Sequence, residues 1–132
     1  FAGLAIAWVT ALGLIGPLLV DHEIKASQSA ADSGDIASAV SHADTARSIE
    51  PWAATPYVQL GLLSQLQGDD VTAAGRLSQA INREDRSWIL YYLRSKIEHE
   101  AGDVASARAD LRRAQQLNPL EECLREGWDG CG

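Results

Sequence analysis

The chain has 132 residues, 46% of them hydrophobic, and its 18 acidic and 11 basic residues give a formal net charge of −7. This length allows one small domain and one extra element. The acidic balance argues against a nucleic-acid partner, because proteins that bind nucleic acid present a basic face to the phosphates.

The first twenty residues, 1–20, carry no charged side chain. A helix of this length rises about 30 Å, which matches the hydrocarbon core of a bilayer. We therefore expect a transmembrane helix over residues 1–20, with a signal-peptide remnant or a buried helix of a soluble protein as alternatives. A signal peptide would begin with Met and a basic segment, whereas this chain begins with Phe1. That start leads us to expect a fragment of a longer protein.

The segment that follows the apolar run is acidic, with Asp21 and Glu23 beside a single Lys25. Cytoplasmic flanks of membrane helices are enriched in Lys and Arg, and no such cluster is found here. We therefore expect the rest of the chain to lie on the extracytoplasmic side of the membrane.

Three Gly-Asp pairs, which begin at Gly34, Gly68 and Gly102, lie 34 residues apart, and an alanine-rich run at helical spacing follows each. A constant period of this size indicates a repeat architecture. Each copy is typical of a helix–turn–helix hairpin. The glycine gives the turn its backbone freedom, and the aspartate can cap the second helix. Three stacked hairpins share a core that one hairpin cannot bury alone.

The period and the prolines together predict the helix boundaries. We expect first helices at 20–33, 54–67 and 88–101, and second helices at 36–50, 71–84 and 104–117. Asn118-Pro119 ends the last helix. Residues 120–125 are expected to form one further turn over the open end of the stack, and the glycine-rich residues 127–132 are expected to be frayed.

The repeat unit resembles the tetratricopeptide repeat (TPR), whose period is 34 residues. The middle copy matches best, and the matching packing positions of all copies are Ser27, Ala39, Ala46, Tyr57, Leu60, Gly61, Ala73, Leu77, Ala80, Ala107, Leu111 and Ala114. The resemblance implies an all-α fold, with three hairpins in a right-handed superhelical stack behind one hydrophobic membrane helix. It places repeats at about 20–53, 54–87 and 88–121, that is a TPR domain over 21–121, with a C-terminal cap and flexible tail over 122–132.

No catalytic pattern is found in the sequence. The three histidines, His22, His42 and His99, lie in different expected helices without metal-ligand spacing, and there is no phosphate-binding loop or nucleophile elbow. We therefore expect no catalytic residue, no metal and no cofactor in this chain.

The two cysteines, Cys123 and Cys131, both lie in the tail and fit no zinc pattern. If the tail is extracytoplasmic, a disulfide can close this short glycine-containing loop. Two free thiols are the alternative.

The resemblance also implies where a partner binds, because the first helices of TPR domains line the concave face. We expect another protein or subunit to contact Leu62, Gln65, Tyr92, Lys96 and His99, with Tyr92 as a rigid aromatic anchor. This groove lacks the lysine and asparagine set with which some TPR domains hold a C-terminal carboxylate, so chaperone tails are not expected. The alternative is that this face is ordinary amphipathic helix surface.

TPR repeats bind many unrelated partners, so the fold alone selects no function. One hypothesis is a membrane-anchored interaction module on the extracytoplasmic side, forming the C-terminal part of a larger bacterial membrane protein. The alternative is the accessory tail of an O-antigen ligase-like (WzyC-type) enzyme. Proteins of that kind also place repeats of this style behind a last membrane helix, and every catalytic residue would then lie upstream. Further hydrophobic spans upstream of residue 1 would decide for the enzyme.

Overall fold

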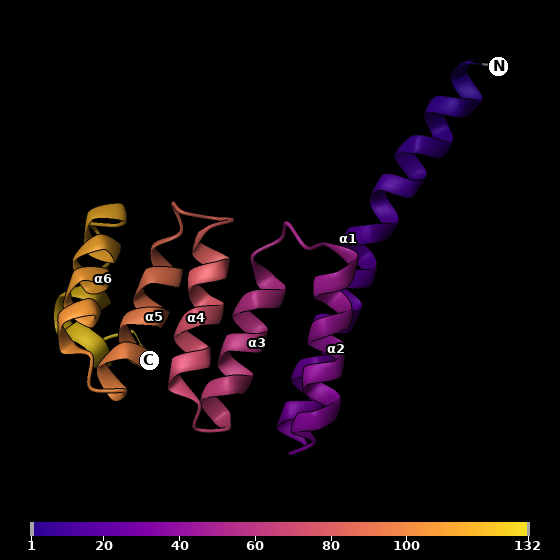
Figure 1. The fold of residues 1–132 in the computed structure, drawn as a ribbon. Coiled ribbons are helices and arrows are strands. Elements are labelled where there is room, and N and C mark those ends of the chain that lie inside the picture. Colours follow the sequence, from indigo (N-terminus) through magenta and orange to yellow (C-terminus); the bar gives the residue numbers. More distant parts are fainter. Residues whose placement is uncertain (1, 132) are drawn as a thin grey trace.

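A computed structural model describes the backbone of residues 2–131 and the side chains of residues 15–128, 130 and 131. Within this part of the chain there are six α-helices, one 3-10 helix and no strand. The elements are α1 (Ala2–Asp32), α2 (Ile36–Ile49), α3 (Thr55–Leu66), α4 (Asp70–Ile81), α5 (Trp88–Glu100), α6 (Val104–Leu117) and η1 (Glu122–Asp129). The six α-helices form three hairpins that lie side by side, and η1 follows at the C-terminal end (Figure 1).

The all-α class is confirmed, and two features differ from the expected hairpins. The 3-10 helix η1 is an element beyond the three hairpins. The helix α4 ends at Ile81 rather than at residue 84, because the chain turns back at Arg83. The N–H of Arg83 donates to Ala80 O, and its Nε donates to Pro51 O at 2.7 Å.

The helix α1 is continuous from Ala2 to Asp32, with Pro17 inside it. The first helix of the first hairpin therefore runs on from the apolar segment without a linker, and the N-terminal part of α1 projects beyond the stack (Figure 1). Most of the expected transmembrane segment 1–20 lies outside the residues whose side chains are described. Among the described residues, no helix combines the length and the apolar character that crossing a membrane requires.

The turn inside each hairpin is built in the same way three times. Its glycine has a positive φ that other residues rarely adopt, with values of 83°, 77° and 87° at Gly34, Gly68 and Gly102. The aspartate that follows caps the second helix by accepting from a backbone N–H three residues on. These hydrogen bonds join Asp35 to Ser38, Asp69 to Thr72 and Asp103 to Ser106. Hydrogen bonds to the side chain and the backbone of Ser38, Thr72 and Ser106 lower the pKa of the three carboxyls.

The core of the stack is made mostly of small side chains. Of the packing positions that the repeat predicts, Leu111 is half-buried and the others are buried. The alanines among them, Ala39, Ala46, Ala73, Ala80, Ala107 and Ala114, are 0% exposed. Alanine side chains allow the backbones of the paired helices to lie close together. The helix contacts in each hairpin therefore tolerate little added side-chain volume.

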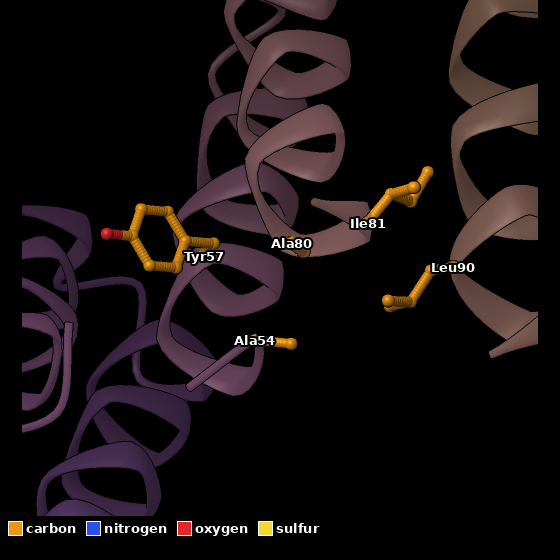
Figure 2. Packing of buried hydrophobic residues seen from close by; sticks show 5 residues of the cluster. All are labelled: Ala54, Tyr57, Ala80, Ile81 and Leu90. Atoms are coloured by element: carbon orange, nitrogen blue, oxygen red, sulfur yellow. The ribbon is translucent and has the colours of Figure 1, made fainter. Parts of the chain in front are cut away.

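The second and third hairpins are joined by a buried apolar cluster of Ala54, Tyr57, Ala80, Ile81 and Leu90. Figure 2 shows Ile81 at the end of α4 and Leu90 near the start of α5, with both side chains between the two helices. The hydroxyl of Tyr57 adds a polar contact next to this cluster, because it accepts a 2.6 Å hydrogen bond from Arg83 Nη2. The guanidinium of Arg83 also lies 3.7 Å from the centre of the Tyr57 ring.

A substitution at Gly61 tests how closely α3 and α4 approach each other. A Cβ at this position would lie 3.3 Å from Ala73 O and 3.4 Å from Leu77 Cγ. We expect Gly61→Leu to lower the free energy of unfolding by about 1–3 kcal/mol through overpacking, measured by urea denaturation. Gly75→Ala is the matched control, because no atom lies within 4 Å of a Cβ there. It should raise stability by up to about 1 kcal/mol through helix propensity. Equal midpoints for Gly61→Leu and wild type would contradict the packing.

Candidate functional site

The first-helix face is the surface carried by α1, α3 and α5. Its centre on α3 is apolar, with Leu62 half-buried and Leu66 68% exposed. Ile89 on α5 adds a further apolar side chain, 47% exposed. The face is tied across α3 and α5 by Gln65, whose Nε2 donates to Glu100 Oε2 at 2.8 Å. An apolar strip bordered by polar groups is therefore open to solvent on this face.

The α1 part of the face is mainly structural. Ile24 is buried in a cluster with Val20 and Ala46. Ser27 is also buried, where its Oγ donates to the Ala39 carbonyl at 2.8 Å and accepts from Gln59 Nε2 at 3.0 Å. Because these groups hold the first and second hairpins together, α1 offers few side chains to a partner.

Tyr92, the expected anchor, is 2% exposed and is not available at the surface. Its hydroxyl donates to Trp128 O at 2.8 Å and accepts from the N–H of Cys131 at 3.0 Å. The expectation of an accessible aromatic anchor is therefore wrong, because the C-terminal segment covers this side chain.

The C-terminal segment, residues 121–131, packs on α5 and α6. Leu124 of η1 is 1% exposed in a cluster with Tyr92 and Ala114. The ring of Trp128 stacks on His99 with their centres 3.8 Å apart. At Gly127 the backbone has a φ of 82°, where the chain changes direction. Residues 127–131 thus lie against the stack, whereas their glycine content leads one to expect a frayed end.

The two cysteines of this segment form a disulfide, Cys123–Cys131. The bond closes the segment into a loop, so the backbone partners of Tyr92 are held in place. A signal for this arrangement is visible in the sequence, where the two cysteines bracket Trp128. What the period could not indicate is that the loop folds back onto α5.

The groove residues are thus divided between two surroundings. Leu62 and Gln65 lie on the open part of the first-helix face, and Tyr92 lies beneath the C-terminal segment. His99 is exposed but has one ring face stacked on Trp128. Lys96 is half-buried between the two parts, with its Nζ 5.8 Å from the centre of the Tyr92 ring. The open surface therefore centres on α3 rather than on α5.

A polar cluster inside the third hairpin was not expected from the sequence. Arg94 donates to both carboxylate oxygens of Asp110 and, through Nη1, to Ser78 Oγ at 2.8 Å. Glu98 lies beside them, with Oε1 3.7 Å from Arg94 Nε and with Oε2 buried without a hydrogen-bond partner. Burial and the nearby charge of Asp110 raise the pKa of Glu98 to about 7. Arg94 stands one period after Leu60, so a charged residue at a leucine position is the signal that could have revealed this cluster.

The described part of the chain contains no enclosed pocket and no group of three potential metal ligands. The open strip on the first-helix face is thus the candidate site.

No protein-family model and no curated protein matches the chain. Solved structures match it by fold. An O-GlcNAc transferase mutant of Thermobaculum terrenum superposes with a TM-score of 0.74 at 20% identity, over 86% of this chain and 22% of that chain. The present chain thus corresponds to a small part of that enzyme.

Two further solved structures are matched over most of their own length. The TPR domain of Arabidopsis OM64 has a TM-score of 0.71 at 17% identity, over 83% of this chain and 90% of that chain. The Yersinia enterocolitica type III secretion chaperone SycD, in complex with a peptide of the translocator YopD, has a TM-score of 0.71 at 16% identity, over 80% and 81%. The chain therefore has a TPR-like fold.

Glu98 makes stability depend on pH. Its pKa is about 7 in the folded protein against an ordinary value of 4.5, so the folded state holds a proton that the unfolded state releases. The contribution of Glu98 to stability is therefore full below about pH 4.5 and is lost as the pH rises through 7. We expect Glu98→Gln to raise the melting temperature at pH 8 and the gain to shrink toward pH 4.5. The exposed Glu84→Gln is the control, and a gain for Glu98→Gln that does not vary with pH would contradict the assignment.

The disulfide should hold the C-terminal segment on α5. We expect the double variant Cys123→Ser, Cys131→Ser to lose about 2–3 kcal/mol of stability, because the unfolded chain is no longer constrained. Trp128 fluorescence should shift to the red as its ring leaves His99. Thiol labelling of the wild type before and after reduction, read by mass spectrometry, reports the bond directly. Two reactive thiols in protein from an oxidising compartment would count against it.

Proposed function

We propose that this chain is a membrane-anchored TPR-like interaction module that holds a protein partner on the extracytoplasmic side, as the C-terminal part of a larger bacterial membrane protein. The observation that carries the interaction role is the open apolar strip of Leu62 and Leu66 on the first-helix face. Exposed apolar surface rimmed by polar groups is typical of binding sites. In the Yersinia chaperone of the same fold, a translocator peptide is bound.

The chemistry of the strip suggests the kind of partner segment. Leu62 and Leu66 offer apolar area, and Lys96, which stands one period after Leu62 on α5, offers a positive charge. A partner segment with an apolar side chain and a nearby carboxylate would match both. Gln65 and Glu100 bond to each other in the free chain, so a polar partner group has to replace that bond.

The membrane anchor and the side of the membrane rest on other observations. The uncharged run of residues 1–20 and its acidic flank support a span with the repeats outside. The disulfide Cys123–Cys131 supports the same side, because disulfides persist in oxidising compartments.

The second candidate is the accessory tail of an O-antigen ligase-like enzyme. It is favoured by the direct continuation of the apolar segment into the first hairpin within α1. In that case the repeats position a partner or subunit beside a catalytic part that lies upstream.

A photo-crosslinking amino acid at Leu66 tests the interaction role in cells that make the full-length protein. We expect one defined protein to be captured from this position. The same probe at Gln79, exposed on the second helix α4, should capture none. Leu66→Ala should weaken binding of that protein by about 1–2 kcal/mol, because apolar contact area is lost, and should leave the helical signal unchanged. Equal capture from Leu66 and Gln79 would place the partner elsewhere.

A further inference from the structure

The connections of the stack lie on two opposite edges. The glycine turns occupy one edge, here called the turn edge, and comprise residues 32–35, 67–70 and 100–103. The loops between hairpins occupy the other edge, here called the loop edge, and comprise residues 50–54, 82–87 and 118–121. Figure 1 shows that α1 leaves the stack on the loop edge as it runs toward the N-terminus.

The two edges carry different charges. The turn edge has six carboxylates and no Lys or Arg, the six being Asp32, Asp35, Asp69, Asp70, Glu100 and Asp103. The loop edge has two arginines, Arg83 and Arg86, against four carboxylates, Glu50, Glu84, Asp85 and Glu121. An anionic lipid surface therefore repels the turn edge more strongly than the loop edge.

The exposed apolar side chains of the loop edge are of the kind that suits a lipid interface. Trp52 in the first loop is 70% exposed, and Leu120 in the last loop is 84% exposed. Tryptophan prefers the membrane–water interface, because its ring is apolar and its N–H is polar. Leu66 and Val71 are exposed next to the turn edge, but they adjoin its carboxylates Asp69 and Asp70.

The first loop also lies beside the apolar run, where α1 leaves the stack. Glu50 Oε1 comes so near to Gly16 of α1 that a Cβ there would lie 3.1 Å from it. Trp52 follows two residues later in the same loop. Because Val20 packs on Ala46 of α2, the part of α1 that is free to enter a bilayer ends near Gly16. If the apolar run crosses the bilayer up to that point, this loop lies in the headgroup region, which is about 5–7 Å thick on each side of the hydrocarbon core.

We propose that the loop edge rests on the lipid surface, with Trp52 in the interface beside the point where α1 enters the membrane. This inference rests on the membrane anchor of the proposed function. This contact orients the module. The turn edge then points away from the bilayer, and the first-helix face extends from the loop edge at the bilayer to the turn edge.

Fluorescence quenching by brominated lipids tests the orientation with the whole chain. The protein is reconstituted into vesicles of phosphatidylcholine and phosphatidylglycerol whose acyl chains carry bromine either near the headgroup or near the terminal methyl. One variant keeps only Trp52, through Trp8→Phe, Trp88→Phe and Trp128→Phe, and a second keeps only Trp8. The matched control carries Val71→Trp next to the turn edge and Phe at all four native tryptophan positions, because Val71 is 83% exposed and tolerates a larger side chain. Circular dichroism checks that each variant is folded.

We expect Trp52 to lose fluorescence most with bromine near the headgroup, Trp8 to lose it with bromine near the terminal methyl, and the Val71→Trp control to lose none. Quenching of Trp8 without quenching of Trp52 would overturn the orientation and leave the membrane anchor intact. Quenching of Trp52 without Trp8 would support lipid contact at the loop edge and contradict the span. Equal quenching of Trp52 and of the control, or quenching of neither native tryptophan, would overturn the inference.

Discussion

The close approach of paired helices at small residues is the constraint on which the rest of the structure depends. Ala39, Ala73 and Ala107 are fully buried at equivalent positions of the three hairpins, and Gly61 allows α3 to contact the backbone of α4. Contacts of this kind bury little apolar area per residue, so no hairpin is stable without a neighbour. The two outer hairpins each have only one neighbouring hairpin. The extension of α1 beyond the first hairpin and the C-terminal segment on the third are the additional elements at the two ends.

The interior of the third hairpin is partly polar, which gives a reason for the disulfide-closed C-terminal segment that packs on it. At the position of Leu60 it carries Arg94, and the adjoining Glu98 and Asp110 make its interior partly ionic. A buried ion pair stabilises less than apolar packing of the same volume, and Glu98 is destabilising when it is ionised. The apolar residue Leu124 and the stacked ring of Trp128 add contacts on the outer side of the third hairpin. The disulfide constrains the short segment that carries them.

The fold was predictable from the sequence because its signals are local and repeated. Each turn needs a residue with a positive φ and, directly after it, a residue that caps the next helix. Glycine and aspartate meet these two requirements, as at Gly34 and Asp35, and both are visible in the sequence. The site was less predictable because its contacts are non-local. Tyr92 occupies a groove position by register, yet its partners are backbone atoms of residues 128 and 131, which no period specifies. The raised pKa of Glu98 likewise depends on burial and on charges that the packing of α5 on α6 brings together.

For the proposed interaction module, the continuity of α1 bears on how a partner would be selected. The helix runs from Ala2 to Asp32 without a break, and its C-terminal half packs on α2 and is hydrogen-bonded to α3 through Ser27 and Gln59. In a membrane-anchored protein, a rigid helix of this kind fixes the height and the direction of the strip at Leu62 and Leu66, whereas a flexible linker would let the strip sample many orientations. Loss of this orientational freedom raises the effective concentration for a partner segment at the matching height and lowers it for all others. Specificity then comes from position as well as from side-chain chemistry. The small apolar area of the strip is sufficient for a partner that the membrane already holds nearby, because little association entropy remains to be lost.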